Sequence, residues 1–392
     1  MMHSIRPSSR FGFAAALLLS LALIGGCETV DKADKPAKLT KIKQTVPLQK
    51  AWTASVGGAK PKLRLGLGVA VDGDRVFIAG HNGQVRSLSL KTGKQLWQIN
   101  TRLPLSGGPG AGDGLVVVGA SHGDLVALDA QTGRRRWKTR INSEMLSAAA
   151  IKGDYVVLRT VDGRLHALRA SDGTQIWQIE QQVPRLSLRG SATPLLMDDV
   201  AISGFDNGRV MAVALRDGST VWDVAVSPPS GRTELERLVD VDSTIKALED
   251  DVYAVTFQGK VARLARDSGQ IWWARDVSSY RGLAVDDDGV YVSNADGQII
   301  KIGRRTGVEI WRKDTLKNRR PSAPVVLGGV VIVTDFDGVV HAFDTATGEE
   351  TGRVKGGGKL VSTPPAVADG LVLFMNDQGK LTAWRIGKSR RG

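Results

Sequence analysis

A spaced glycine and tryptophan motif recurs along the chain and constrains its fold more than any other feature. In one copy, Gly123 and Gly133 lie ten positions apart, and Trp137 follows the second glycine by four. The same spacing recurs at Gly83, Gly93 and Trp97; Gly163, Gly173 and Trp177; Gly208, Gly218 and Trp222; Gly259, Gly269 and Trp273; and Gly297, Gly307 and Trp311. Self-similarity of this kind is typical of a fold built by repeating one structural unit.

The length and content of the repeat indicate what that unit is. The first glycines of successive copies lie 38 to 51 residues apart. Each copy holds short β-rich runs, such as Leu115–Val118 and Leu125–Leu128, separated by Gly, Asp or Asn. Four short strands in about 40 residues form one blade of a β-propeller. The sequence therefore predicts an all-β fold, an eight-bladed β-propeller of four-stranded blades over residues 48–387.

The two ends of the repeat array complement each other. The eighth copy begins at Gly379 and stops before its fourth strand, whereas Leu48–Ser55 resembles the fourth strand around Trp97. We therefore expect the N-terminal strand to complete the eighth blade and close the ring, which removes an exposed sheet edge. The seventh copy keeps its glycines but has Gly352 where tryptophan is expected.

Tryptophan is unusually common among the aromatic residues, with nine Trp against four Tyr and eight Phe. The repeat places one Trp on the outer strand of most copies. A large flat side chain at that position can wedge between neighbouring blades and bury on the order of 200 Å². Because these residues repeat in register, we interpret them as structural and not as a sugar-stacking surface.

The N-terminus has the features of an export signal. Arg6 and Arg10 precede an apolar run from Phe11 to Ile24, which is too short to span a bilayer and suits the core of a signal peptide. The run ends at Gly25-Gly26-Cys27, which looks like a bacterial lipobox, and Cys27 is the one cysteine of the chain. We expect residues 1–26 to be removed and Cys27 to become lipidated.

The segments that flank the repeats are polar. Residues 27–47 are rich in Lys, Asp and Thr without a strand or helix period, so we expect a flexible tether there. Residues 388–392 form a basic tail. Glu28 follows the lipidated cysteine, and because Asp at that place is the usual inner-membrane retention signal, Glu28 favours the periplasmic face of the outer membrane.

Charge and metal-ligand patterns argue against several functions. A single cysteine excludes an intrachain disulfide, a multi-cysteine zinc site and a cysteine-ligated iron–sulfur cluster. The blade histidines at positions 81, 122, 166 and 341 have no metal-ligand spacing, and we predict no catalytic residue, metal or cofactor. The formal net charge of +13 suggests an anionic partner surface, such as lipid or an acidic protein, and nucleic acid is not expected outside the cytoplasm.

Two segments stand outside the repeat consensus, on consecutive blades with the longest repeat steps. Arg189 lies 19 residues before Gly208, and Asp240 lies 19 residues before Gly259, so the two positions are equivalent. The candidate partner-binding residues are Leu186, Leu188, Arg189, Asp240 and Asp242. Apolar, cationic and anionic side chains at one rim can form a specific protein contact. An Arg189–Asp240 bridge that merely stiffens the two loops is the alternative.

The unit from Ala127 to Trp137 resembles the tryptophan-docking repeat of pyrroloquinoline-quinone-type propellers. With the lipobox and the segments at 186–190 and 237–242, the chain resembles the BamB family of outer-membrane assembly lipoproteins along nearly its whole length. The resemblance implies a non-catalytic scaffold whose five candidate residues contact a periplasmic POTRA domain of BamA. It also implies indirect contact with other lipoproteins of the machine and with unfolded outer-membrane proteins.

Two other functions use related propellers. A quinone-dependent periplasmic dehydrogenase shares the repeat, but this chain lacks a vicinal cysteine pair and a clear calcium-site constellation. A propeller that binds polysaccharide is the third possibility.

Overall fold

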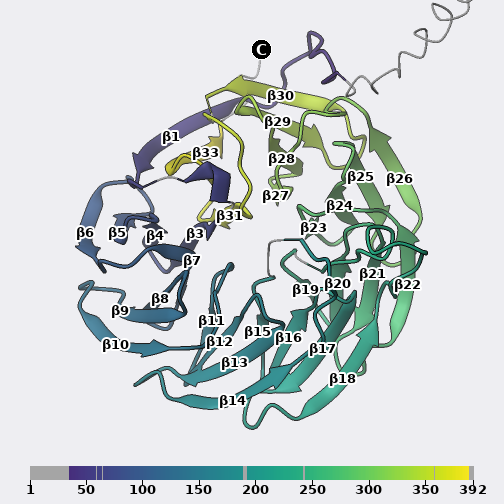
Figure 1. Cartoon of the computed structure of the whole chain (residues 1–392). Coiled ribbons are helices and arrows are strands. Elements are labelled where there is room, and N and C mark those ends of the chain that lie inside the picture. Colours follow the sequence, from purple (N-terminus) through teal and green to yellow (C-terminus); the bar gives the residue numbers. More distant parts are fainter. Residues whose placement is uncertain are drawn as a thin grey trace, which may run out of the picture. The chain divides into compact units, whose positions relative to one another are not determined.

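The computed structural model describes residues 35–387 except 59, 64, 189–191, 242 and 357. Residues 48–387 form an eight-bladed β-propeller of four-stranded antiparallel sheets, which confirms the predicted fold (Figure 1). The predicted signal peptide, the lipidation site at Cys27 and the basic tail lie outside the described residues. Within those residues, no helix has the length and apolar character needed to cross a membrane.

Blades one to four follow each other along the chain, and each runs from its innermost to its outermost strand. Their strands are β3 (Val69–Asp72), β4 (Arg75–Ala79), β5 (Gln84–Ser89) and β6 (Gln95–Asn100); β7 (Leu105–Gly112), β8 (Leu115–Ala120), β9 (Asp124–Asp129) and β10 (Arg135–Arg140); β11 (Ala150–Lys152), β12 (Tyr155–Arg159), β13 (Arg164–Arg169) and β14 (Gln175–Glu180); and β15 (Leu195–Met197), β16 (Val200–Gly204), β17 (Arg209–Ala214) and β18 (Thr220–Ala225).

Blades five to eight repeat this order, except that the last blade takes its outer strand from the N-terminus. Their strands are β19 (Lys246–Leu248), β20 (Asp251–Val255), β21 (Lys260–Ala265) and β22 (Ile271–Asp276); β23 (Leu283–Val285), β24 (Gly289–Ser293), β25 (Ile299–Gly303) and β26 (Glu309–Lys313); β27 (Val325–Leu327), β28 (Val330–Thr334), β29 (Val339–Asp344) and β30 (Glu350–Lys355); and β31 (Ala366–Ala368), β32 (Leu371–Met375), β33 (Lys380–Ile386) and β1 (Leu48–Ser55). A short 3₁₀ turn, η1 (Pro61–Leu63), and β2 (Gly66–Leu67) connect β1 to blade one along the chain. Strand β2 also pairs in parallel with β7, which gives the sheet of blade two a short fifth strand.

The ring closes as the sequence predicted. Strand β1 pairs antiparallel with β33, from Leu48 opposite Ile386 to Ser55 opposite Lys380. The two ends of the propeller therefore share one sheet, and the ring is held by backbone hydrogen bonds and not by side chains alone.

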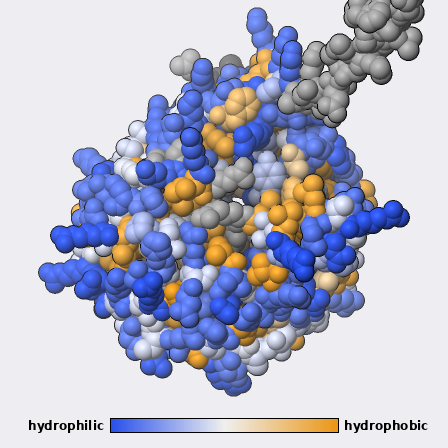
Figure 2. All heavy atoms as spheres, in the orientation of Figure 1, coloured by the Kyte–Doolittle hydropathy of each residue, from blue (hydrophilic) through white to orange (hydrophobic). Residues whose placement is uncertain are grey.

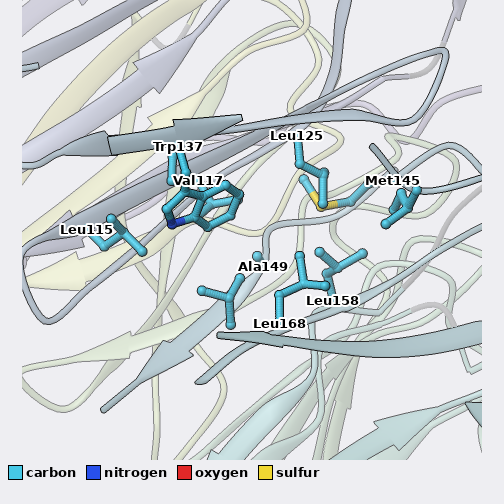
Figure 3. Close-up of a cluster of buried hydrophobic side chains, with 11 residues drawn as sticks. Leu115, Val117, Leu125, Trp137, Met145, Ala149, Leu158 and Leu168 are labelled. Carbon is cyan, nitrogen blue, oxygen red and sulfur yellow. The ribbon is translucent and has the colours of Figure 1, made fainter. Parts of the chain in front are cut away.

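The hydrophobic core is divided among the junctions between blades. The middle strands are buried on both faces, which is why β8 reads as the continuous apolar run Leu115–Val118. In the described chain, eight apolar clusters correspond to the eight junctions. Figure 3 shows the junction between blades two and three, where the labelled side chains are Leu115, Val117, Leu125, Trp137, Met145, Ala149, Leu158 and Leu168.

The repeated tryptophans lock successive blades together. Trp97 of blade one packs on Gly133 of blade two so closely that an added Cβ would lie 2.8 Å from the indole ring. Its Nε1 donates a hydrogen bond to the carbonyl oxygen of Ala130 at 2.9 Å. Six further indoles make the equivalent bond at 2.7 to 3.1 Å, namely Trp52, Trp137, Trp177, Trp222, Trp273 and Trp311. The predicted wedge role is therefore confirmed, and each wedge also satisfies a turn carbonyl.

The missing tryptophan of the seventh repeat lies at the junction that closes the ring. Blade eight takes its third and fourth strands from opposite ends of the chain, so no turn joins them there to receive an indole. The chain before β1 occupies the place instead, because a Cβ at Gly352 would lie 2.6 Å from the carbonyl oxygen of Val46. The buried indole of Trp384, on β33, packs with Val46 and Leu48 in this junction.

The sequence predicted a flexible tether up to residue 47, and the structure corrects this for residues 37–46, which we call the strap. The strap lies outside β30 (Figure 1). The amides of Thr45 and Val46 both donate to the Thr351 carbonyl oxygen, at 2.8 and 3.0 Å, and Ala37 donates to the Lys317 carbonyl oxygen at 3.0 Å. A polar composition suggested disorder, but an outer strand offers unpaired backbone groups that an extended segment can bind.

Candidate partner-binding face

Both long insertions lie on one face of the propeller. In a blade of four antiparallel strands, the turn between the second and third strands is on the same face as the connection to the next blade. Residues 181–194 connect β14 to β15, and residues 226–245 connect β18 to β19. We call this side the insertion face. One face of the ring, viewed along its axis, has apolar side chains near the middle and mostly hydrophilic ones at the periphery (Figure 2).

The structure brings two of the five predicted site residues into direct contact. The backbone N–H of Leu188 donates a hydrogen bond to Oδ2 of Asp240, which joins the two insertions. Leu186, two residues earlier, is 41% exposed. Arg189 and Asp242 lie outside the described residues, and so does the alternative Arg189–Asp240 bridge.

Asp240 is predicted as a partner-binding residue at the rim, and the structure places its side chain inside the loops. Its side chain is 1% exposed, and within the described chain its Oδ1 has no hydrogen-bond partner. The backbone around it is held by blades four and five, because Val241 donates to the Phe205 carbonyl oxygen and Phe257 donates to the carbonyl oxygen of Asp240. The carboxylate is therefore buried between the two insertions, where it bonds the backbone of the first. Asp240 is a positioning residue for Leu188.

The electrostatic surroundings of Asp240 disfavour its charge. Burial is the main effect that raises its pKa, to about 7 from 3.8; the Leu188 amide lowers it, the neighbouring Asp206 raises it further, and Arg159 lowers it. Asp206 is paired with Arg159, and both side chains are buried. The guanidinium of Arg159 also lies 5.1 Å from the ring centre of Phe205.

Sequence reasoning missed Arg159 and Asp206, although the repeat contains a signal for the first. Arg159 lies four residues before the turn glycine Gly163. The equivalent positions in the other copies are uncharged, being Ala79, Gly119, Gly204, Val255, Ser293, Thr334 and Met375. A charged residue at one buried repeat position needs a partner, and here the partner is the Asp206 turn of the next blade.

The second insertion is braced internally and keeps one apolar side chain outside. The Glu236 carboxylate accepts hydrogen bonds from the N–H groups of Arg232 and Thr233, at 2.7 and 3.1 Å. These bonds outweigh its slight desolvation and lower its pKa. Leu235 is 64% exposed beside this brace. The insertion face therefore presents exposed leucines from both insertions over a buried polar support.

The described residues contain no group of three His, Cys, Asp or Glu side chains that could hold a metal ion. The aspartates at 286–288 instead form a turn, in which Oδ1 of Asp286 accepts the amides of Asp288 and Gly289 at 3.0 and 2.8 Å.

The chain is thus a closed β-propeller with one face built from two long loops. The family model described as outer membrane protein assembly factor BamB matches residues 48–102, 81–313 and 298–391. The chain belongs to the BamB family. A BamB of Pseudomonas aeruginosa is 44% identical over 373 residues, 95% of this chain and 98% of that protein. A BamB of Alkalilimnicola ehrlichii is 42% identical over 387 residues, 98% of this chain and 99% of that protein.

Solved structures agree with this assignment. The crystal structure of BamB from Moraxella catarrhalis matches with a TM-score of 0.80 and 30% identity, covering 86% of this chain and all of that one. A quinohemoprotein alcohol dehydrogenase from Comamonas testosteroni matches with a TM-score of 0.67 at 12% identity, over 90% of this chain and 79% of that one. At this identity the likeness to the dehydrogenase shows a shared fold alone.

Proposed function

We propose that this chain is a non-catalytic assembly factor that aids the insertion of β-barrel proteins into the outer membrane, anchored by a lipidated Cys27 on the periplasmic side. Its partner is a BamA-like protein, and the insertion face binds one of that protein's POTRA domains. The alternative of a quinone-dependent dehydrogenase has no support beyond the shared fold.

The observation that carries the proposed site is the bond between the two insertions. Asp240 accepts the Leu188 amide, so a carboxylate from one insertion fixes the backbone of the other. Leu186 lies two residues away, and its side chain is exposed. Leucine side chains on a braced loop lose little conformational entropy on binding, which favours a specific protein contact.

The test is the affinity of the chain for the purified POTRA region of a BamA-like protein, measured by calorimetry. Leu186→Ala with Leu188→Ala should weaken binding about tenfold to a hundredfold, as truncation of apolar side chains at an interface centre does. The matched control is Leu96→Ala with Val221→Ala, two apolar side chains on outer strands that are 46% and 48% exposed.

The control should bind like the parent, and all variants should melt like it. If the Leu186 and Leu188 variant keeps full affinity, the insertion face is not the binding surface. If it loses affinity and also melts early, the two leucines support the loops and do not contact the partner.

A further inference from the structure

The strap is held on blade seven by two arginines as well as by its backbone. Arg319 donates through Nη1 to the carbonyl oxygen of Ala37 at 3.1 Å, and Arg353 donates through Nη1 to that of Thr40. Leu39 packs against the apolar cluster between blades six and seven. The strap therefore makes polar and apolar contacts with the propeller along much of its length.

Buried acids hold these arginines in place. Arg319 is bonded to Asp335 at 2.7 Å, and Arg353 is bonded to Glu350 at 2.7 Å. His341 lies between the two carboxylates, 2.7 Å from Glu350 and 3.4 Å from Asp335. Such a connected network fixes the arginine side chains before the strap binds them.

The outer side of the strap is basic. Lys38, Lys41 and Lys43 are exposed, whereas Leu39 and Ile42 are partly buried, so the lysines project away from the propeller. Residues 35–47 contain no acidic side chain. Lys317 and Arg320 are exposed on the loop that binds Ala37.

The route of the chain indicates what this basic edge faces. The strap begins at Ala37 on the insertion face, beside the loop after β26. Cys27 is ten residues earlier, and ten extended residues reach about 35 Å at most. A freely flexible segment from Cys27 to residue 47 would reach about twice as far. If Cys27 is lipidated, the strap edge is held close to the membrane surface.

We propose that the strap lysines Lys38, Lys41 and Lys43 form a second membrane contact that binds anionic phospholipid headgroups. This rests on the proposed lipid anchor at Cys27. One lipid signal together with a basic patch gives firmer attachment than either alone. Because the strap is fixed to blade seven, the contact also orients the insertion face relative to the membrane.

The experiment uses the full mature chain with Cys27→Ala, which cannot be lipidated, so that vesicle binding depends on the protein surface alone. The probes are vesicles of phosphatidylethanolamine with phosphatidylglycerol and vesicles of neutral phosphatidylcholine, at low salt. Each lysine near an anionic surface strengthens binding about fivefold. Lys38→Gln, Lys41→Gln and Lys43→Gln together should therefore weaken binding to the anionic vesicles at least about tenfold.

The matched control is Arg134→Gln, Arg135→Gln and Arg136→Gln, which removes three exposed positive charges from blade two. It should bind anionic vesicles within about twofold of the parent. If both triple variants weaken equally, the attraction is a net-charge effect and the strap is not the contact.

Two further outcomes would overturn the membrane assignment. In the first, the lysine variant binds vesicles as the parent does. In the second, it also loses affinity for the POTRA region, which would show that the strap contacts a protein. The calorimetric test of the Leu186 and Leu188 variant with the POTRA region contains no lipid. The two experiments can therefore contradict the membrane contact and the partner site separately.

Discussion

Two buried polar clusters both pair arginines with carboxylates but are balanced differently. The first, which we call the loop cluster, contains Arg159, Asp206 and Asp240, so one described cation faces two carboxylates. The second, the strap cluster, contains Asp335, His341 and Glu350 with Arg319 and Arg353. In the loop cluster the pKa of Asp240 is raised; in the strap cluster the pKa values of Asp335 and Glu350 are lowered.

The difference follows from what surrounds each carboxylate. Burial alone would raise the pKa of Asp335 and Glu350, but hydrogen bonds from His341 and the arginines outweigh it, with the Val339 amide contributing at Asp335. Asp240 receives one amide bond and lies near a second carboxylate. The strap cluster is completed by the chain itself and binds the chain's own N-terminal segment. Among the described residues, Oδ1 of Asp240 in the loop cluster has no hydrogen-bond partner, and it lies at the face where we propose that the partner binds.

The largest expected effect on stability comes from removing a carboxylate of the strap cluster. Asp335→Ala removes a fully buried carboxylate that pairs with Arg319, and leaves the half-exposed Asp337 as the only acidic partner of that arginine among the described residues. Removing one partner of a buried ion pair typically costs about 3–5 kcal/mol of unfolding free energy, which chemical denaturation measures. Asp337→Ala is the control, because that carboxylate binds the same arginine but is half exposed, and its loss should cost less than about 1 kcal/mol. Equal costs for the two would remove the contrast between the clusters.

Neutralising the carboxylate of the loop cluster should raise the free energy of unfolding, whereas removing Asp335 lowers it. Asp240→Asn removes a charge that burial disfavours and keeps an oxygen that can accept the Leu188 amide. A pKa near 7 in place of 3.8 makes the folded state less stable as the pH rises, so above about pH 8 we expect the variant to gain about 2–3 kcal/mol. The matched comparison is Asp335→Asn, which should lose stability under the same conditions.

The pH dependence provides an independent check of the sign. A raised carboxyl pKa means that the stability contributed by neutral Asp240 is complete below about pH 4 and is lost as the pH rises towards 7. Lowered pKa values for Asp335 and Glu350 mean that their contribution is present above their unfolded pKa values and is lost as the pH falls below those values through the lower pKa values of the folded state. The advantage of Asp240→Asn should therefore vanish near pH 4. An advantage that is the same at all pH values would show that the pKa of Asp240 does not differ between the folded and the unfolded chain.

The strap side offers a further test, because there the chain itself replaces a repeat residue. Gly352→Trp restores the repeat consensus but places a side chain against the Val46 carbonyl oxygen. Overpacking of this kind typically costs about 1–3 kcal/mol, and we expect about 2 kcal/mol by denaturation together with a displaced strap. A stabilised variant would mean that the strap yields and the closing junction accepts an indole like the others.

Much of the fold could be predicted from the sequence because each blade repeats the same local chemistry. The glycine that receives an indole and the tryptophan that donates to a turn carbonyl are both visible as spacing, as with Gly133 and Trp97. The closing strand was predictable because Leu48–Ser55 supplies the strand that the eighth copy lacks.

The parts that escaped prediction depend on contacts between segments without a shared period. Nothing near residue 40 indicates that Arg353 binds the Thr40 carbonyl oxygen, because the acceptor is backbone and carries no sequence signal. The equivalence of Arg189 and Asp240 located the two loops on one face, but not the depth of the carboxylate. Asp240 is buried because Val239 and Val241, on either side of it, anchor the loop to blade four.

The smallest expected effect concerns opening of the strap alone. Arg353→Gln removes the donor to Thr40 while the backbone bonds of Thr45 and Val46 remain. Arg353 also pairs with Glu350, which keeps its contact with His341, so we expect global stability to fall by about 1–2 kcal/mol and local opening of the strap to become several times more frequent. Because trypsin cleaves after lysine only in an opened segment, cleavage after Lys38, Lys41 or Lys43 should accelerate in proportion to that opening.

The control is Arg136→Gln on blade two, which breaks an exposed pair with Asp129 and should leave strap cleavage unchanged. If Arg353→Gln and the parent are cut at the same rate in the strap, then the arginines do not hold it. The strap would then be attached by its apolar and backbone contacts, and the strap cluster would stabilise blade seven alone.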